Sequence, residues 1–153
     1  MTPAEVAEYL ARELTVILIS NGADGYPHPM PMHFCVREGG AIAMTTFRKS
    51  QKVLNLRRDP RASLLIESGA TYDALRSVLM YCDTTIIDDT EATAQCMIEC
   101  RAHSNLARGT PTSAAEDTEF AQTAAQRAQK RLVLEFQPQR VISWDHAKLG
   151  GRY

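Results

Sequence analysis

The segment Thr45–Glu67, TTFRKSQKVLNLRRDPRASLLIE, most constrains the fold, because it places a short helix between two strand-like runs. Ser50 is a residue type that caps helix N-termini, so a helix is expected to begin directly after it. That helix must stop at Asp59-Pro60, since proline pushes the preceding residue out of the α region. The chain then runs extended and apolar through Arg61–Glu67, as a buried strand does.

Positive charge gathers at the start of this helix, where Arg48, Lys49 and Lys52 surround Ser50. A helix N-terminus presents unpaired backbone N–H groups and the positive end of the helix dipole, so it favours anions. The pattern is compatible with a phosphate site beside a sheet. The alternative is a solvated basic face, which is common for runs of charge.

The remaining chain reads as further strands joined by short turns, followed by two helices. Thr2-Pro3-Ala4-Glu5 forms a capping box that predicts a helix over Pro3–Arg12. Two more helices are expected over Asp88–His103 and over the residues from Ser113 to about Gln129. Strands are expected over Leu14–Ser20, Pro27–Val36, Ala41–Thr46, Arg61–Glu67, Ala74–Ile87, Arg131–Phe136 and Arg140–Trp144. Tight turns between strands favour an antiparallel barrel.

Bulk composition narrows the function classes. A chain of 153 residues suits one domain, residues 1–153, and a formal net charge of −1 gives no general attraction to nucleic acid or to an acidic membrane. No apolar run reaches the roughly 20 residues of a membrane span, and the acidic N-terminus does not resemble a secretory signal. A cytoplasmic location is therefore expected, with the four cysteines as reduced thiols.

Three stretches carry a family resemblance, in order along the chain: LISNGADGYPHPMPMHF, Thr45–Glu67 and VLEFQPQRVISWDHAKLGG. Together they resemble the pyridoxamine 5′-phosphate oxidase-like superfamily of flavin- and deazaflavin-binding split-barrel proteins. The resemblance covers roughly residues 14–89 and 130–151. It implies a mainly β fold with flanking helices (α+β), a six-stranded antiparallel split barrel of the FMN-binding type. It also implies a homodimer with the cofactor at the subunit interface.

The resemblance also implies which residues bind the cofactor. Lys52 and Ser50 match the positions that hold its phosphate, whereas Gln51 stands where the oxidase branch usually carries arginine. Lys49 or Arg57 would supply the missing charge. The full set implied for cofactor binding is His28, Met30, Thr45, Thr46, Lys49, Ser50, Gln51, Lys52, Arg57, Trp144 and Lys148. No residue stands out as the catalytic acid or base.

Each part of this set has a plainer interpretation. The Thr45-Thr46 pair also suits an ordinary strand, His28 and Met30 suit a rim strand, and Trp144 suits a core anchor. Cys96, Cys100 and His103 fall at i, i+4 and i+7, which could present ligands to a metal. A buried apolar stripe explains both cysteines, so no metal site is expected from this spacing.

The function expected from the resemblance is an oxidoreductase that transfers hydride between bound FMN or deazaflavin and a small unsaturated or aromatic substrate. FMN ranks first, because coenzyme F-420 would need further cations for its acidic tail. The alternative is a non-catalytic flavin or haem carrier, storage protein or sensor, with His28, His33 or His146 as haem ligands. The sequence names no substrate.

Overall fold

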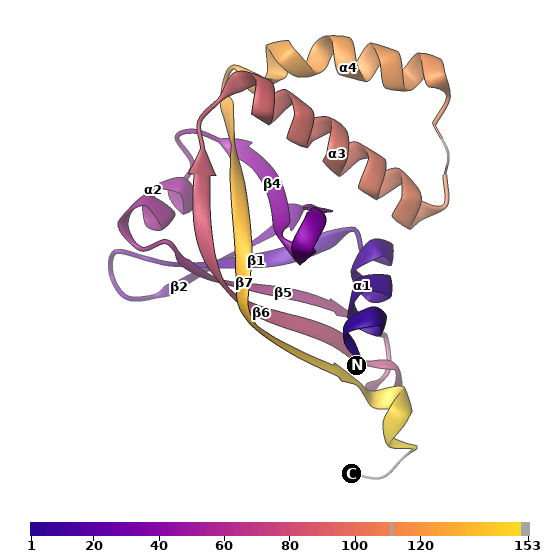
Figure 1. Ribbon diagram of the computed structural model, residues 1–153. Helices are drawn as coiled ribbons and strands as arrows, with labels where there is room; N and C mark the ends of the chain where they lie inside the picture. The colour runs from indigo at the N-terminus through magenta and orange to yellow at the C-terminus, as the bar shows by residue number, and fades with distance from the viewer. Residues whose placement is uncertain (111, 151–153) are drawn as a thin grey trace.

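Alternating apolar residues and short turns bring the strands into one antiparallel sheet, ordered β2-β1-β5-β6-β7-β4-β3. The computed structural model describes residues 1–110 and 112–150. The long strands β6 and β7 bend, so that β4 comes to lie across from β1 and β5 and the sheet forms a half-barrel (Figure 1). The strands are β1 (Thr15–Asn21), β2 (Pro27–His33), β3 (Cys35–Val36), β4 (Ile42–Phe47), β5 (Arg61–Ser68), β6 (Arg76–Ile87) and β7 (Arg131–Asp145).

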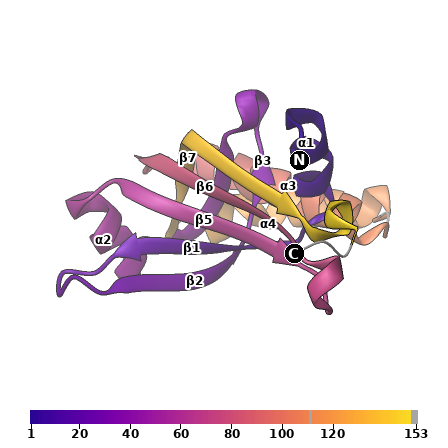
Figure 2. The same cartoon turned by 90° about the horizontal axis from the view of Figure 1, so that it is seen from below.

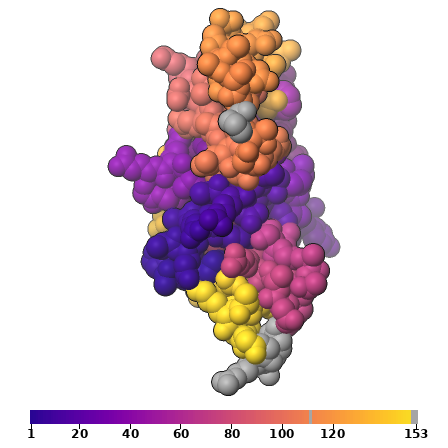
Figure 3. All heavy atoms as spheres, turned by 90° about the vertical axis from the view of Figure 1, so that its right-hand side faces the viewer, coloured from indigo at the N-terminus to yellow at the C-terminus, as the bar shows by residue number. Residues whose placement is uncertain are grey.

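Helices cover the ends of the half-barrel and leave much of its outer surface open. They are α1 (Pro3–Arg12), α2 (Gln51–Arg58), α3 (Thr90–Arg108) and α4 (Ala114–Ala128), with single turns η1 (Glu38–Gly40), η2 (Tyr72–Ala74) and η3 (His146–Leu149). The helices α3 and α4 form a hairpin at one end, whereas η3 lies at the other end, with α1 between them (Figure 3). The short helix α2 stands apart from both, beside the hairpin of β1 and β2 (Figure 1).

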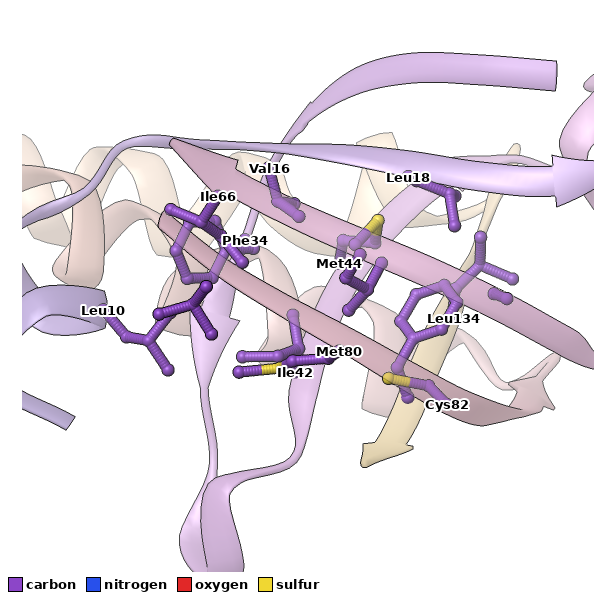
Figure 4. Packing of buried hydrophobic residues seen from close by; sticks show 14 of the residues in the cluster. Leu10, Val16, Leu18, Phe34, Ile42, Met44, Ile66, Met80, Cys82 and Leu134 are labelled. Carbon is purple, nitrogen blue, oxygen red and sulfur yellow. The ribbon is translucent and has the colours of Figure 1, made fainter. Parts of the chain in front are cut away.

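The hydrophobic core fills the space between the two halves of the sheet (Figure 4). Val16 and Leu18 of β1 face Met44 of β4 and Leu134 of β7, and all four side chains are at most 1% exposed. Phe34, which is fully buried, separates β2 from β3. Burial of these alternate positions fixes which face of each strand points inward, because a shift of one residue would reverse every side chain.

Most expected elements are confirmed. The helix over Pro3–Arg12 has its capping box, and the strand with three prolines is the edge strand β2, where missing N–H groups cost no ladder bonds. The chain as a whole has the expected split-barrel character. The sheet has seven strands rather than the six of the implied barrel, because the expected strand over Pro27–Val36 divides at Phe34 and the expected strands over Arg131–Phe136 and Arg140–Trp144 join into one.

Two boundaries were predicted wrongly. The helix expected to end at His103 continues to Arg108 and ends where Gly109 takes a left-handed conformation with φ of 63°. The two strands expected on either side of Gln137-Pro138 form the single strand β7. The register against β6 shifts between Tyr81 and Cys82, so the strand absorbs its proline at an irregularity rather than a turn.

Among the described residues, no helix combines the length and the apolar character that crossing a membrane requires.

Candidate functional site

The N-terminal end of α2 is held against the sheet by backbone hydrogen bonds. The Arg48 N–H donates to the carbonyl of Lys130 at 3.1 Å, and the Ser50 N–H donates to the carbonyl of Phe47 at 3.0 Å. These bonds turn the chain sharply out of β4 and leave Ser50 extended at the N-cap. The helix therefore starts directly at the end of a strand, as the sequence predicts.

The expected capping bond from the Ser50 side chain is absent. Its hydroxyl lies 3.3 Å from Thr46 Oγ1 instead, because Thr46 points inward from the end of β4 beneath the turn. Within the described part of the chain, the backbone N–H groups of Gln51 and Lys52 consequently have no hydrogen-bond partner. Two free N–H groups at the positive end of a helix favour an anion.

Lys52 contributes a buried cation to the same place. Its side chain is nearly enclosed, with 8% of the residue exposed, and Nζ donates to Thr46 Oγ1 at 3.3 Å. No carboxylate in the described chain forms an ion pair with it. Burial lowers the pKa of the Lys52 ammonium group. A charge that is removed from water and has only a hydroxyl partner is costly, so this arrangement suits a ligand that brings negative charge.

The neighbouring arginines are already engaged with protein groups. Arg48 and Arg57 both pair with Asp88, the latter at 3.9 Å. Arg58 donates to the carbonyl of Asn21. The guanidinium of Arg61 pairs with the carboxylate of Asp59 at 2.9 Å. Arg57, which the family resemblance implied for cofactor binding, thus has Asp88 as a partner in a long, solvent-exposed ion pair.

Lys49 has the opposite character. It is exposed, and no ion pair or hydrogen bond to its side chain occurs within residues 1–110 and 112–150. It can therefore swing toward a ligand at the helix end. Among the described residues, Lys49 and Lys52 have no carboxylate partner and lie at the N-terminal end of α2, whereas Arg58, which bonds the carbonyl of Asn21, lies at the other end of the helix.

A pocket of about 330 Å³ opens beside the first turn of α2. Gln51 donates to Asn55 at 3.0 Å, and Asn55 donates to the hydroxyl of Ser20 at 3.1 Å. His28 lies opposite Ser20 in the register of β1 and β2, and its Nδ1 is buried without a hydrogen-bond partner in the described chain. Buried polar atoms are rarely left unpaired, so His28 has capacity to bond a ligand here. The lining residues are Gly22, Ala23, Asp24, Tyr26, Pro27, His28, Gln51 and Asn55.

Two further residues of the implied set are placed by strand alternation. Met30 lies opposite Leu18 and is half-buried on the inner face of β2, the face that also carries His28. Thr45 lies on the face of β4 opposite to Thr46 and is half-buried. Only Thr46 of the threonine pair therefore joins the hydroxyl cluster around Lys52.

Trp144 and Lys148 lie far from this cluster within one chain. Trp144 pairs with Ser77 near the end of β7 and is 37% exposed. Lys148 Nζ bonds both carboxylate oxygens of Glu5 at 2.6 and 2.7 Å, and this bond lowers the pKa of Glu5 to about 2. Figures 1 and 2 show α2 and the C-terminal segment at opposite ends of the sheet. The structure does not bring these two residues to α2 within a single chain.

The outer face of the sheet is a feature that the sequence did not single out. One cross-strand row runs from Pro31 through Ile17, Leu65 and Leu79 to Ile142. Strands β2, β1, β5, β6 and β7 carry this row, and Figure 2 shows them with no helix in front. Every position in the row is apolar, although alternation places it on the outside of the half-barrel. The one signal in the sequence was that both sets of alternating positions in these strands, inward-facing and outward-facing, carry apolar residues.

A family comparison connects this geometry to known proteins. The family model described as pyridoxamine 5′-phosphate oxidase matches residues 2–145, nearly the whole chain. The chain belongs to this family. Relatives in this family bind flavins or the deazaflavin F420. No curated protein matches the chain.

Solved structures agree with the fold. A conserved hypothetical protein from Mycobacterium tuberculosis is 35% identical with a TM-score of 0.84, and the match covers 100% of this chain and 90% of that one. An F420 reductase is 17% identical with a TM-score of 0.63, covering 88% and 94%. The haem storage protein HutZ from Vibrio cholerae is 16% identical with a TM-score of 0.64, covering 92% of each chain. The latter two share the fold alone.

Proposed function

We propose that the protein is an oxidoreductase that binds FMN, or alternatively F-420, and transfers hydride between the bound ring and a small unsaturated or aromatic substrate. The observation that carries this proposal is the buried ammonium group of Lys52, which has no carboxylate partner in the described chain and lies at the N-terminal end of α2. Family membership supplies the class of cofactor whose phosphate such a site would hold.

The groups present fit a phosphate monoester. The donors at the helix end are the Lys52 ammonium group, the free backbone N–H groups of Gln51 and Lys52, and the Ser50 hydroxyl. Lys49 can approach the same ligand from solvent. Charge-assisted donors of this kind form the shorter and stronger hydrogen bonds. His28, Met30 and Thr45 lie on strands beside the same helix end and would contact the remainder of the cofactor. The bound ring would supply the redox chemistry, and the protein would hold and orient it.

FMN is the first choice of cofactor. Its single phosphate requires no more than the compact group around Lys52. The acidic tail of F-420 would need additional cations, and Arg57 and Arg58 are already bonded within the protein. The F420 reductase among the structural neighbours keeps the deazaflavin as the alternative.

We also propose that the protein is a homodimer that pairs through the outer face of the sheet. The apolar row from Pro31 to Ile142 supports this proposal, because it is contiguous and no more than half-buried on the outer face, and contiguous apolar surface marks interaction sites. A hollow of about 400 Å³ adjoins this face and is lined in part by Ile19, Ser63 and Tyr81. A second subunit would also be the route by which Trp144 and Lys148 reach a cofactor held at α2 of the first.

A non-catalytic role as a haem or flavin binding protein is the second candidate. The specific observation in its favour is His28, whose buried Nδ1 has no partner in the described chain. In contrast, Nδ1 of His33 lies 3.0 Å from the carbonyl of Leu14, and Nδ1 of His146 lies 2.9 Å from that of Tyr72. His28 also lines the pocket beside α2, so it is the first choice for an axial ligand in this alternative, whereas His33 and His146 could bind iron only through Nε2.

Spectroscopy and turnover separate the candidates. Purified protein is titrated in turn with FMN, F-420 and haem, and each reduced cofactor that binds is tested with enones, quinones and nitroaromatics. The proposed oxidoreductase gives saturable binding of FMN or F-420 together with oxidation of the reduced cofactor by a substrate. Binding without turnover across the panel supports the carrier, and a Soret band that is lost in His28→Ala supports the haem form. Failure to bind any of the three contradicts both candidates.

A further inference from the structure

Three cysteines that are distant in the sequence come together under the helical hairpin. Cys35 lies on β3, and Cys96 and Cys100 lie one turn apart on α3. The three Sγ atoms are all within 4.8 Å of one another. Cys35 is 2% exposed, Cys96 is fully buried and Cys100 is partly buried. The spacing of Cys96 and Cys100 was visible in the sequence, whereas the third thiol comes from a two-residue strand that only the fold brings near.

The surroundings leave the sulfur atoms with few other bonding partners. The carbonyl of Ala43 on β4 accepts weak contacts from Cys35 at 3.6 Å and from Cys100 at 3.7 Å. Ala43 and Val133 form the rest of the small buried cluster, together with Cys35 and Cys96. Close-packed neutral thiols gain little from one another, because S–H is a weak donor and sulfur a weak acceptor.

A charged pair lies at the edge of this cluster. Arg37, two residues after Cys35, bonds Glu99 on α3 at 3.0 Å and also bonds Glu135 on β7. Glu99 Oε2 lies 3.8 Å from the Sγ of Cys35. The guanidinium of Arg37 can offset the negative charge of thiolates, and the carboxylate of Glu99 is close enough to Cys35 to supply a fourth ligand.

We propose that Cys35, Cys96 and Cys100 form a binding site for one thiophilic metal ion of the Zn²⁺ or Cu⁺ type. Binding would convert three thiols to thiolates, release three protons and form three metal–sulfur bonds. Thiolates select these soft or borderline ions, and zinc–sulfur bonds of about 2.3 Å place sulfur atoms about 4 Å apart. Sulfur atoms within 4.8 Å of one another therefore need only a small contraction to bind an ion.

The site differs from the one that the sequence suggested. His103 was the third candidate ligand there, but its Nε2 lies 2.9 Å from the carbonyl of Glu13 and its ring packs on Phe34 at 4.7 Å. Cys35 takes its place. An ion bound by Cys35, Cys96 and Cys100 would tie α3 to the edge of the sheet at β3, on the side of the molecule away from α2. This metal-site proposal does not depend on the proposed cofactor.

Cadmium titration of the reduced, metal-free full-length protein tests the site. Cd²⁺ reports thiolate ligands through its ultraviolet charge-transfer absorption. We expect the absorption to saturate at one ion per chain, Zn²⁺ to displace the ion, and thermal unfolding to move to higher temperature as the concentration of Cd²⁺ rises. Absence of a band that saturates at one equivalent would overturn the proposal.

Matched variants assign the ligands. Cys35→Ser, Cys96→Ser and Cys100→Ser should each weaken Cd²⁺ binding by at least tenfold and reduce the charge-transfer absorption. Cys82→Ser is the control, since Cys82 is equally buried but lies in the main core on β6. Cys100 is the most accessible of the three, so its variant is the least demanding on folding. Retention of full affinity in Cys100→Ser, or equal loss in Cys82→Ser, would overturn the assignment.

Discussion

At the scale of single residues, Lys52 is buried with a hydroxyl as its only partner in the described chain. Such a charge destabilises the unliganded protein and is retained where a ligand compensates it. We expect Lys52→Met to raise the melting temperature of the unliganded protein by about 2–4 °C, which corresponds to roughly 1 kcal/mol for a chain of this size. Thermal unfolding by circular dichroism measures it. Lys49→Met, at an exposed position, should leave the melting temperature unchanged, and a lower value for Lys52→Met would contradict this account.

Lys52 also predicts a dependence of stability on pH. Burial lowers its pKa in the folded state, so the unfolded chain binds the proton more tightly. Stability therefore rises as pH increases through the lowered folded value toward the ordinary value of 10.5. Urea unfolding of the wild type and of Lys52→Met across this alkaline range measures the difference, since other groups titrate in both. The advantage of the variant should shrink with rising pH, and a constant difference would disprove the linkage.

Contacts between sequence neighbours follow from local sequence, whereas contacts between distant segments do not. Lys52 and Thr46 meet at the end of β4 because the turn between them is short. The pairing of Arg57 with Asp88 depends on the junction of β6 and α3, because Asp88 lies 31 residues after Arg57 and no local signal connects them. The free Nδ1 of His28 depends on the register of β1 against β2, which the sequence did not specify.

At the scale of elements, the turn between β5 and β6 depends on Gly69. Its φ is +117°, and a Cβ added there would lie 2.3 Å from the carbonyl oxygen of Ala74. We expect Gly69→Ala to cost about 1–3 kcal/mol through strain and backbone displacement. Gly25→Ala is the control, because Gly25 also has a positive φ but no atom within 4 Å. Urea unfolding should rank Gly69→Ala well below Gly25→Ala, and equal losses would show that the close contact is relieved at no cost.

Element boundaries follow from signals of unequal strength. The ends of α1 and α2 were predictable, since a capping box and an Asp-Pro pair act through neighbouring residues. The continuity of β7 through Pro138 was not, because it requires the long strand β6 as a partner. The turn that Pro138 predicts locally is therefore absent, because β7 pairs with β6 on both sides of the proline.

At the scale of the whole molecule, the apolar outer row predicts association of two chains. Light scattering should give twice the 17.0 kDa chain mass. Tyr81→Lys, at a 43% exposed position beside this row and opposite Arg140, should weaken the dimer by tenfold or more, because bringing like charges together at an interface is strongly unfavourable. Leu106→Glu, at a 71% exposed position on α3, should leave the mass unchanged. A monomeric wild type would contradict the proposed interface.

The central claim is that the N-terminal end of α2 binds the phosphate of a flavin-type cofactor, and titration of wild type and Lys52→Met with FMN and with F-420 tests it most directly. We predict saturable binding of one cofactor per chain. The affinity of Lys52→Met should be about 10- to 150-fold lower, since a hydrogen bond to a charged group contributes about 1.5–3 kcal/mol. Arg57→Met should lose less, because Arg57 pairs with Asp88. Equal affinity of Lys52→Met and wild type, or no binding by the wild type, would contradict the claim.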